Sequence, residues 1–430
     1  MGGMKMPYSR EPNDSSVILN DRKACIRIIQ ALKAGRAPRE GVRFLSVGIE
    51  EIIEQLQQAF AQASQNKPRI FGLIRDYGEG KSHMLRLIAA LAEEQGFAWA
   101  YVVHDKDQLI GFHKPSYLFG RLLFELQWSN PDLCLDEFFE REEREIEEIC
   151  DDLRDDYPRS WQERAEYIYD RNMRSGLVDR LAEIAVHLHD DKHHGLVICI
   201  DELENCCQLH WNQHRPAYET LSRLIHPSNC PLILCFGLTE SGLEFLEWLW
   251  RYYVGNEATE LFNSIRSESL KMPSLTNEHA LELAKRIFQL HASAFDWQPT
   301  VEVQKIAQHA LEVAKRNSSG QWRTFVQSVV TQLEVAYQKV HLYQPSTFPP
   351  SPPPSPPKPT PRIKLRLSVQ PPTPKLPVLQ VGDRVEIIKG PFRGWRGTVE
   401  RVKDLKAEIM LGGPNAMRIW QPLDALKKLR

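Results

Sequence analysis

The chain has 430 residues, of which 42% are hydrophobic, so it has room for two or three domains with sizeable cores. No apolar run approaches the ~20 residues of a membrane span, and the N-terminus lacks the apolar region of a signal peptide. These patterns argue against a membrane protein, and we expect a cytoplasmic protein that does not bind a membrane.

The formal net charge of -2 hides an asymmetry along the chain. From Lys358 to Arg430 the sequence has 16 Lys and Arg against 6 Asp and Glu, a net charge of +10, so the preceding residues carry -12. A basic C-terminal part on an acidic body predicts an anionic partner. We expect nucleic acid, either RNA or DNA, or the protein machinery that acts on it.

Residues 1–65 are expected to form an N-terminal helical segment. Apolar residues recur at helical spacing in "RKACIRIIQALKAG", which ends at Gly35, and again in "VGIEEIIEQLQQAF" after a proline-containing turn. This segment leads into a predicted α/β core over residues 66–272.

The core begins with a strand, a loop and a helix in the order that a phosphate-binding loop requires. "RIFGLI" (Arg69 to Ile74) is a short apolar run that suits a buried parallel strand. "RDYGEGKS" follows and nearly matches the pattern G-x-x-x-x-G-K-[ST], except that Arg75 replaces the first glycine. An apolar helical stripe then runs to Gly96, and "FAWAYVV" is predicted as the next strand.

This loop supplies the groups that would bind nucleotide phosphates. The nucleotide-binding residues predicted here are Tyr77, Gly78, Glu79, Gly80, Lys81, Ser82 and His83. Lys81 would neutralise the β- and γ-phosphates, and Ser82 would bind Mg²⁺. Arg75 is tolerable where its φ stays negative, and we expect its side chain to face solvent.

A helical insertion is predicted at about residues 130–190. Its segment from Leu135 to Asp156 is strongly acidic, which favours a solvated helix over a surface for a basic partner. We interpret the histidines that follow as a solvent-exposed loop rather than a metal site; they are His187, His189, His193 and His194. The eight cysteines include no C-x-x-C pair, so neither a disulfide framework nor a zinc ribbon is indicated.

"LVICIDELEN" places five apolar residues before Asp201 and Glu202, the Walker B form of a buried strand that ends in two carboxylates. Mg²⁺ prefers oxygen ligands, so Asp201 would hold it together with Ser82. Glu202 would orient or deprotonate the attacking water. The two motifs together predict ATP and Mg²⁺ as cofactors.

The strand "PLILCFGL" ends at Thr239, the position at which P-loop ATPases of the additional-strand type carry their first sensor. Residues 273–344 are predicted to form a helical lid, whose first helix Thr276 would cap. Within the lid, "GQWR" places Arg323 at the start of a helix.

Residues 345–377 contain 14 of the 29 prolines and are expected to form a stiff, extended linker. Its interruption "RIKLRLSV" is either a docking strand or more linker. In residues 378–430, Val and Ile alternate with polar residues between glycines, a pattern typical of a small antiparallel β-barrel.

Two resemblances follow from these motifs. "GDRVEIIKGPFRGWRGTVERV" is similar to KOW-type SH3-like barrels, which bind RNA, ribosomes or polymerases. The resemblance implies a basic and aromatic rim able to contact nucleic acid, formed by Lys389, Arg393, Trp395 and Arg396. The alternative is that this barrel packs on a protein surface.

Residues from about 20 to 340 resemble the P-loop ATP-binding family of BREX (bacteriophage exclusion) and related bacterial defence loci, through "ACIRIIQALKAGRAP", "FLSVGIEEIIEQL", "DYGEGKS" and "CIDELE". That family is similar to AAA+ and STAND ATPases. The resemblance implies that Arg323 is a second sensor, and that Arg266 is an arginine finger acting in trans, within a homo-oligomer. It also implies partner proteins from the defence system. The chain departs from the family at Arg75, and it has Ser82 where Thr is common.

The sequence therefore predicts an α/β protein: a P-loop NTPase core of the additional-strand type with a mostly parallel sheet, a helical lid and a C-terminal SH3-like β-barrel. The expected function is that of an ATP-hydrolysing AAA+/STAND-type switch recruited to nucleic acid. Two alternatives are a nucleotide sensor that does not hydrolyse ATP, and a nucleic-acid-binding adaptor whose P-loop domain is a scaffold.

Overall fold

The structure is a computed structural model with two compact units, Met1–Lys339 and Val340–Arg430. It describes residues 15–105, 111–128, 141, 144–145, 147–149, 161–190, 193–227, 229–299, 301–317, 320–342, 380, 382–387, 396–403, 406–411, 417–422 and 426–429. The predicted proline-rich linker and its "RIKLRLSV" segment lie outside these residues. Within them, no helix is long and apolar enough to cross a membrane.

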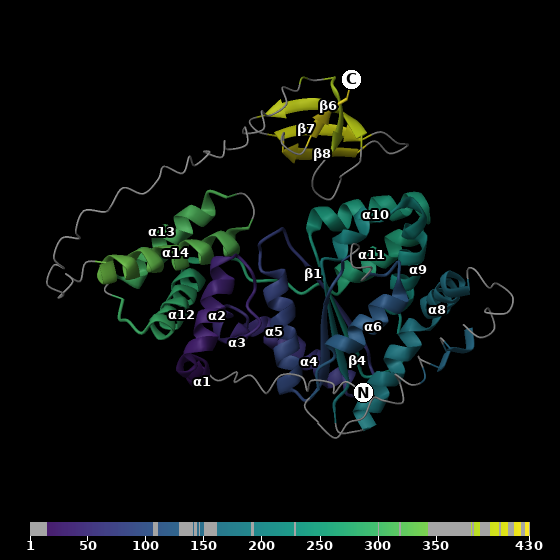
Figure 1. The fold of residues 1–430 in the computed structure, drawn as a ribbon, viewed down its shortest axis with the longest axis horizontal. Helices are drawn as coiled ribbons and strands as arrows, with labels where there is room; N and C mark the ends of the chain where they lie inside the picture. The colour runs from purple at the N-terminus through teal and green to yellow at the C-terminus, as the bar shows by residue number, and fades with distance from the viewer. Residues whose placement is uncertain are drawn as a thin grey trace, which may run out of the picture. The chain divides into compact units, whose positions relative to one another are not determined.

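The first unit is built on a parallel sheet of four strands in the order β1-β4-β3-β2 (Figure 1). The strands are β1 (Arg69–Ile74), β2 (Ala98–Val103), β3 (Leu196–Asp201) and β4 (Leu232–Leu238). Every residue of β3 and β4 is buried, which explains their continuous apolar runs. Ile74 pairs with Leu238 and Val103 with Asp201, so all four strands end at one edge of the sheet.

Helices cover both faces of this sheet. Figure 1 shows α4 (Glu50–Ala63) and α5 (Lys81–Glu94) on one side, and α6 (Pro115–Glu125), α8 (Trp161–Asp190) and α9 (His214–Leu224) on the other. Two short 3-10 helices follow β3, and two α-helices follow β4; they are η1 (Leu203–Gln208), η2 (Trp211–Gln213), α10 (Glu240–Tyr253) and α11 (Glu257–Ser267). The fold is therefore a mixed α/β fold with a parallel sheet, as predicted.

The histidine-rich segment before β3 corrects one prediction. His187 and His189 lie in the last turn of α8, and His193 is buried with its Nδ1 atom 3.2 Å from the Gly96 carbonyl oxygen. The expected solvent-exposed loop is wrong for His187, His189 and His193, because the helix extends to Asp190 and the chain then bonds to Gly96 after α5, whereas His194 is exposed as expected. In the described part of the chain, no three His, Cys, Asp or Glu side chains gather as a metal site.

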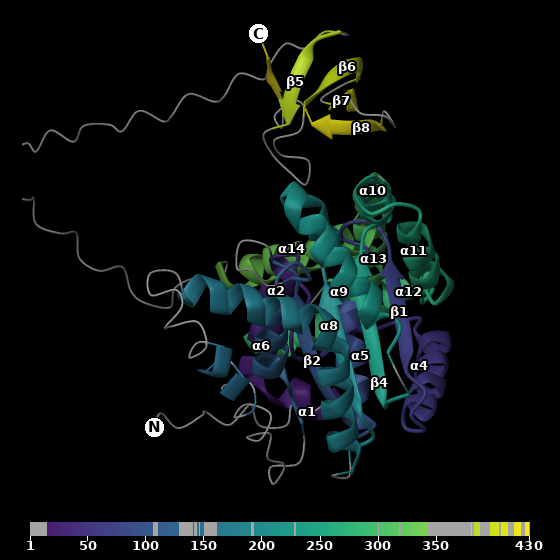
Figure 2. The same ribbon diagram turned by 90° about the vertical axis from the view of Figure 1, so that its right-hand side faces the viewer.

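A second hydrophobic core lies in a helical bundle beside the sheet domain (Figures 1 and 2). It contains α12 (Asn277–Phe295), α13 (Val303–Lys315) and α14 (Gln321–Leu342), together with α1 (Ser15–Asn20) and α2 (Arg22–Lys33). Ile28 and Ile29 of α2 belong to the same buried cluster as Leu283 and Ile287 of α12. The N-terminal helices therefore complete the lid, which the sequence did not indicate.

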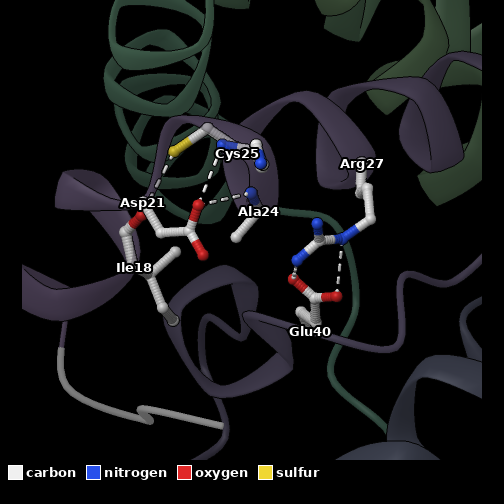
Figure 3. Close-up of polar contacts among 7 residues, drawn as sticks. Ile18, Asp21, Ala24, Cys25, Arg27 and Glu40 are labelled. Atoms are coloured by element: carbon white, nitrogen blue, oxygen red, sulfur yellow. Dashed lines mark hydrogen bonds and ion pairs between the residues drawn. The ribbon is translucent and has the colours of Figure 1, made fainter.

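Polar contacts fix the start of this bundle (Figure 3). Asp21 Oδ1 accepts hydrogen bonds from the backbone N–H groups of Lys23 (2.9 Å) and Ala24 (3.0 Å), and so caps α2. The Cys25 thiol donates to the Ile18 carbonyl oxygen at 3.2 Å. These contacts hold the turn between α1 and α2.

The segment that includes α3 (Val42–Leu45) connects the two cores. Val47 belongs to the bundle core and Ile49 to the core under the sheet. Arg286 Nη1 on α12 donates to the carbonyl oxygens of Phe44 (2.8 Å) and Ser46 (2.6 Å). The lid and the sheet domain are therefore joined here as well as through the chain between α11 and α12.

The second unit contains a five-stranded antiparallel sheet in the order β8-β7-β6-β5-β9. Its strands are β5 (Arg384–Ile387), β6 (Arg396–Lys403), β7 (Lys406–Leu411), β8 (Met417–Pro422) and β9 (Leu426–Lys428). Val385, Val399, Ile409 and Leu426 are its buried hydrophobic residues among those described. The antiparallel strands agree with the predicted alternation, whereas the SH3-like barrel stays a prediction.

Candidate active site

The loop between β1 and α5 has the backbone that its glycines allow. Gly78 and Gly80 adopt φ angles of 81° and 90°, which residues other than glycine rarely adopt. Gly80 directly precedes α5. Among the described non-glycine residues, positive φ occurs at Asn66, Glu202 and Asp296, so Arg75 keeps the negative φ that its position requires.

The side chain of Arg75 does not face solvent as expected. Its Nη2 atom donates a 2.6 Å hydrogen bond to the carbonyl oxygen of Met272, in the chain that leads into the lid. The prediction was wrong because this partner lies 197 residues away, and no local pattern indicates it.

Lys81 is buried at the base of the loop, with 8% of its surface exposed. Its ammonium group donates to the carbonyl oxygens of Arg75 (2.8 Å) and Asp76 (3.1 Å). Burial lowers the pKa of Lys81, and the negative charges of Glu204, Asp201 and Asp76 oppose that shift. The loop therefore curls around a cation that lies close to the carboxylates after β3.

Asp201 is buried at the end of β3 and has two partners. Its Oδ2 accepts a 2.8 Å hydrogen bond from the Tyr101 hydroxyl on β2, and its Oδ1 accepts one of 2.9 Å from the backbone N–H of Glu202. Burial, followed by the charge of Asp201, raises the pKa of Tyr101, so its hydroxyl stays a donor. These bonds hold the carboxylate at the sheet edge with further lone pairs for a metal ion.

Gly237 on β4 makes room for this carboxylate. A Cβ at position 237 would lie 2.6 Å from Asp201 Oδ1 and 2.9 Å from Leu85 Cδ1. We expect Gly237→Ala to displace Asp201 and to weaken Mg²⁺-dependent ATP binding by about tenfold, with less effect without Mg²⁺. Titration with a fluorescent ATP analogue measures this. Gly120→Ala is the control, because nothing lies within 4 Å of its added Cβ; equal losses in both variants contradict the prediction.

Glu202 follows with a strained backbone, φ 57° and ψ 42°, which is unusual for a residue with a side chain. Its carboxylate is exposed, and Oε2 accepts a 3.0 Å hydrogen bond from Asn205 Nδ2. The same Asn205 nitrogen donates to the His104 carbonyl oxygen at 2.8 Å. Asn205 thus ties Glu202 to the end of β2, at the solvent side of the sheet edge.

A third carboxylate, Glu204, lies deeper in the site. Its Oε2 atom is buried and has no hydrogen-bond partner in the described structure. Burial raises the pKa of this carboxyl, and the charge of Lys81 opposes the shift. A Cβ at Gly242, in the first turn of α10, would lie 2.5 Å from both Glu204 Cβ and Thr239 Oγ1. Glu204 therefore packs between the ends of β3 and β4.

The structure places the two sensor candidates differently. Thr239 caps α10, because its Oγ1 accepts a 3.1 Å hydrogen bond from the Gly242 N–H. Arg323 lies in the first turn of α14 and contacts the loop directly: its backbone N–H donates to the Gly78 carbonyl oxygen at 3.1 Å. Its guanidinium carbon lies 4.1 Å from the centre of the Tyr77 ring. The last helix of the bundle therefore touches the loop between β1 and α5.

The remaining predicted site residues lie in different parts of the fold. Ser82 is in the first turn of α5, whereas the His83 ring contacts Ser46 (Nε2 to Oγ, 2.9 Å), and burial lowers its pKa to about 4. Arg266 forms an ion pair of 2.6 Å with Glu247 of α10. In the second unit, Arg396 begins β6, and the other predicted rim residues lie outside the described part; they are Lys389, Arg393 and Trp395.

Sequence reasoning missed Tyr101, Gly237, Asn205 and Glu204. Glu204 stood in the quoted "DELEN" motif, and its spacing from Asp201 was a usable signal. The other three depend on strand neighbours and on the turn after β3, which the sequence does not display.

The parallel sheet, the loop before α5 and the carboxylates after β3 together define an α/β protein with a P-loop. The chain belongs to the family described as BREX system ATP-binding protein BrxC/D, whose model matches residues 21–132 and 173–348, more than half of the chain. The match spans the lid helices and the sheet domain. No curated protein matches the chain.

Two solved structures of Pif1 from Bacteroides sp are similar to part of this chain. The complex with ADP-AlF4 is 12% identical with a TM-score of 0.20, and the unliganded protein is 10% identical with a TM-score of 0.19. Each comparison covers 85% of this chain and 73% of the Pif1 chain. TM-scores this low carry no argument about fold or function.

Proposed function

We propose that this chain binds ATP with Mg²⁺ at the carboxyl edge of its parallel sheet and hydrolyses it, as a switch protein in a phage-defence system. One observation supports this most: the P-loop, the carboxylates after β3 and the start of α14 meet at one edge, although they are far apart in sequence. The position of β4 between β1 and β3 fits a P-loop core of the additional-strand type.

The residues fit the proposed ligands. Gly78 and Gly80 would let backbone N–H groups turn toward the phosphates. Lys81, which is largely shielded from water, would supply the positive charge that the phosphates need. Ser82 and Asp201 would hold Mg²⁺, for which Gly237 leaves room beside the carboxylate. A bound Mg²⁺ would neutralise charge on the phosphate oxygens.

The other residues would act on water and on the lid. Glu202 is exposed at the sheet edge and would orient the attacking water, with Asn205 holding its carboxylate. Thr239 would orient a phosphate oxygen or the water, and Arg323 would contact the γ-phosphate. Arg266 would act in trans in a homo-oligomer after leaving Glu247.

We further propose that the C-terminal unit is a KOW-like module that brings the ATPase to nucleic acid or to its protein machinery. Its basic composition and its antiparallel sheet support this role. Residues 378–430 carry the predicted rim.

Steady-state ATP hydrolysis by the full chain tests the proposal, with and without RNA and duplex DNA. We expect turnover that requires Mg²⁺, that nucleic acid stimulates and that Lys81→Ala abolishes. Lys67→Ala is the control, because Lys67 is an exposed lysine before β1. Nucleotide binding without turnover would contradict hydrolysis and support a sensor, and turnover that nucleic acid leaves unchanged would contradict recruitment through the C-terminal unit.

A further inference from the structure

The P-loop serves as the N-terminal cap of helix α14. The residue before α14 is Gly320, which offers no side chain to its first N–H groups. Two of these groups find partners in the loop: Gln321 N–H donates to Glu79 Oε1 at 2.8 Å, and Arg323 N–H donates to the Gly78 carbonyl oxygen at 3.1 Å. Glu79 thus places a carboxylate at the positive end of the helix dipole.

The backbone of the loop at Gly78 and the backbone before α14 at Gly320 meet without side chains between them. A Cβ at Gly78 would lie 2.8 Å from Gly320 Cα, and both glycines have positive φ angles of 81° and 74°. A side chain at position 78 would block this approach, and one at position 320 would lie 3.2 Å from the Tyr77 carbonyl oxygen. The first turn of α14 therefore rests directly on the loop that would hold the phosphates.

The same loop is also fixed just before the lid. Arg75 donates to the carbonyl oxygen of Met272 at 2.6 Å, and Met272 belongs to the core under the sheet, four residues before the Thr276 cap of α12. The loop thus contacts the segment that leads into the lid through Arg75, and the last lid helix through Glu79. Both side chains sit at positions that the general P-loop pattern leaves to Gly or to any residue.

We propose that Glu79 and Arg75 are positioning residues, so that Arg323 distinguishes ATP from ADP: Glu79 fixes the last lid helix on the phosphate-binding loop, and Arg75 fixes the loop on the segment that leads into the lid. This inference rests on the proposed nucleotide site. With its backbone N–H fixed on Gly78, Arg323 needs only a side-chain rotation away from the Tyr77 ring to approach a γ-phosphate. ADP lacks that phosphate, so we expect the protein to bind ATP more tightly than ADP. We call the contacts of Glu79 and Gly78 with the first turn of α14 the junction.

Hydrogen–deuterium exchange of the backbone in residues 320–326 measures the junction in the full chain, without nucleotide. We expect Glu79→Ala to speed exchange at Gln321 by about tenfold, because its N–H loses a charged acceptor. Exchange at Arg323 should also speed up, because the first turn of α14 is then held on the loop by the Gly78 carbonyl alone. Glu79→Gln keeps an acceptor and should restore part of the protection. Glu93→Ala is the matched control, since Glu93 is exposed near the far end of α5. Exchange in Glu79→Ala equal to that in Glu93→Ala overturns the proposal.

Affinities for fluorescent ATP and ADP analogues measure the consequence. We expect Glu79→Ala and Arg75→Ala each to weaken ATP binding by about tenfold and ADP binding by less than about twofold, as Arg323→Ala should. Equal losses for both nucleotides would make the junction merely structural and overturn the proposal. If the unmodified chain binds neither nucleotide, the proposed function fails, and the exchange experiment still decides whether Glu79 fastens the lid.

Discussion

Replacing Glu202 by Gln is expected to lower kcat for ATP hydrolysis by a factor of about 10² to 10⁴ and to leave ATP affinity nearly unchanged. Glu202 directly follows the buried Asp201, and its carboxylate is exposed, so water can reach it. Asn205 holds this left-handed residue, because its backbone N–H donates to the Glu202 carbonyl oxygen at 2.9 Å and its Nδ2 atom donates to Oε2. Gln retains the size and the contact with Asn205 but cannot accept a proton.

Glu204→Gln is the matched comparison. The Glu204 Oε2 atom is buried from solvent, so this carboxyl is poorly placed to meet an attacking water molecule. We expect kcat to fall by no more than about tenfold in this variant. Single-turnover and steady-state assays of both variants, with ATP affinities measured in parallel, separate the two carboxylates. A large loss in Glu204→Gln with a small one in Glu202→Gln would reverse the assignment.

The strands of the parallel sheet and helix α5 were predictable because each carries a local signal. The continuous apolar runs of β3 and β4 predicted buried parallel strands, and the i, i+3, i+4 pattern after Lys81 predicted α5. The Thr276 cap of α12 was also correct, since Oγ1 accepts from the His279 N–H at 3.1 Å. Signals within one or two turns of chain are sufficient for such elements.

Features that depend on distant partners were not predictable. The joining of α2 to the lid brings Ile28 and Ile29 against residues of α12 that lie over 250 positions later. The contact of Arg75 with Met272 and that of Glu79 with Gln321 are equally remote in sequence. Hydrophobic periodicity says that a helix face is buried, but it does not say against what. The Walker motifs predicted which residues meet at this edge of the sheet, whereas the tertiary fold determines how the helical bundle is attached there.

Acidification is expected to unfold the first unit between pH 6.5 and pH 4. Four of its buried histidines are kept neutral mainly by burial: the pKa of His104 is lowered to about 3, and those of His113, His214 and His291 to about 4. Each also has a buried ring nitrogen with no hydrogen-bond partner in the described structure. Charging any of them in the folded state is therefore costly.

The direction of the effect follows from proton linkage. Since the folded pKa values lie below the unfolded value near 6.5, the unfolded chain binds more protons at intermediate pH, and stability is lost as pH falls. At pH 5 each histidine costs about 2 kcal/mol relative to pH 7.5, so four cost about 8 kcal/mol, comparable with the whole stability of a typical domain.

Urea unfolding of the full chain at pH 7.5, 6 and 5 measures this loss. His291→Gln should remove the contribution of one histidine, so the free energy of unfolding should fall by roughly 2 kcal/mol less between pH 7.5 and 5 than in the unmodified chain. His309→Gln is the control, because His309 is exposed on α13 and should leave the pH dependence unchanged. A free energy of unfolding at pH 5 within about 1 kcal/mol of that at pH 7.5 would contradict the prediction, because it would show that the pKa values of these histidines are not lowered on folding.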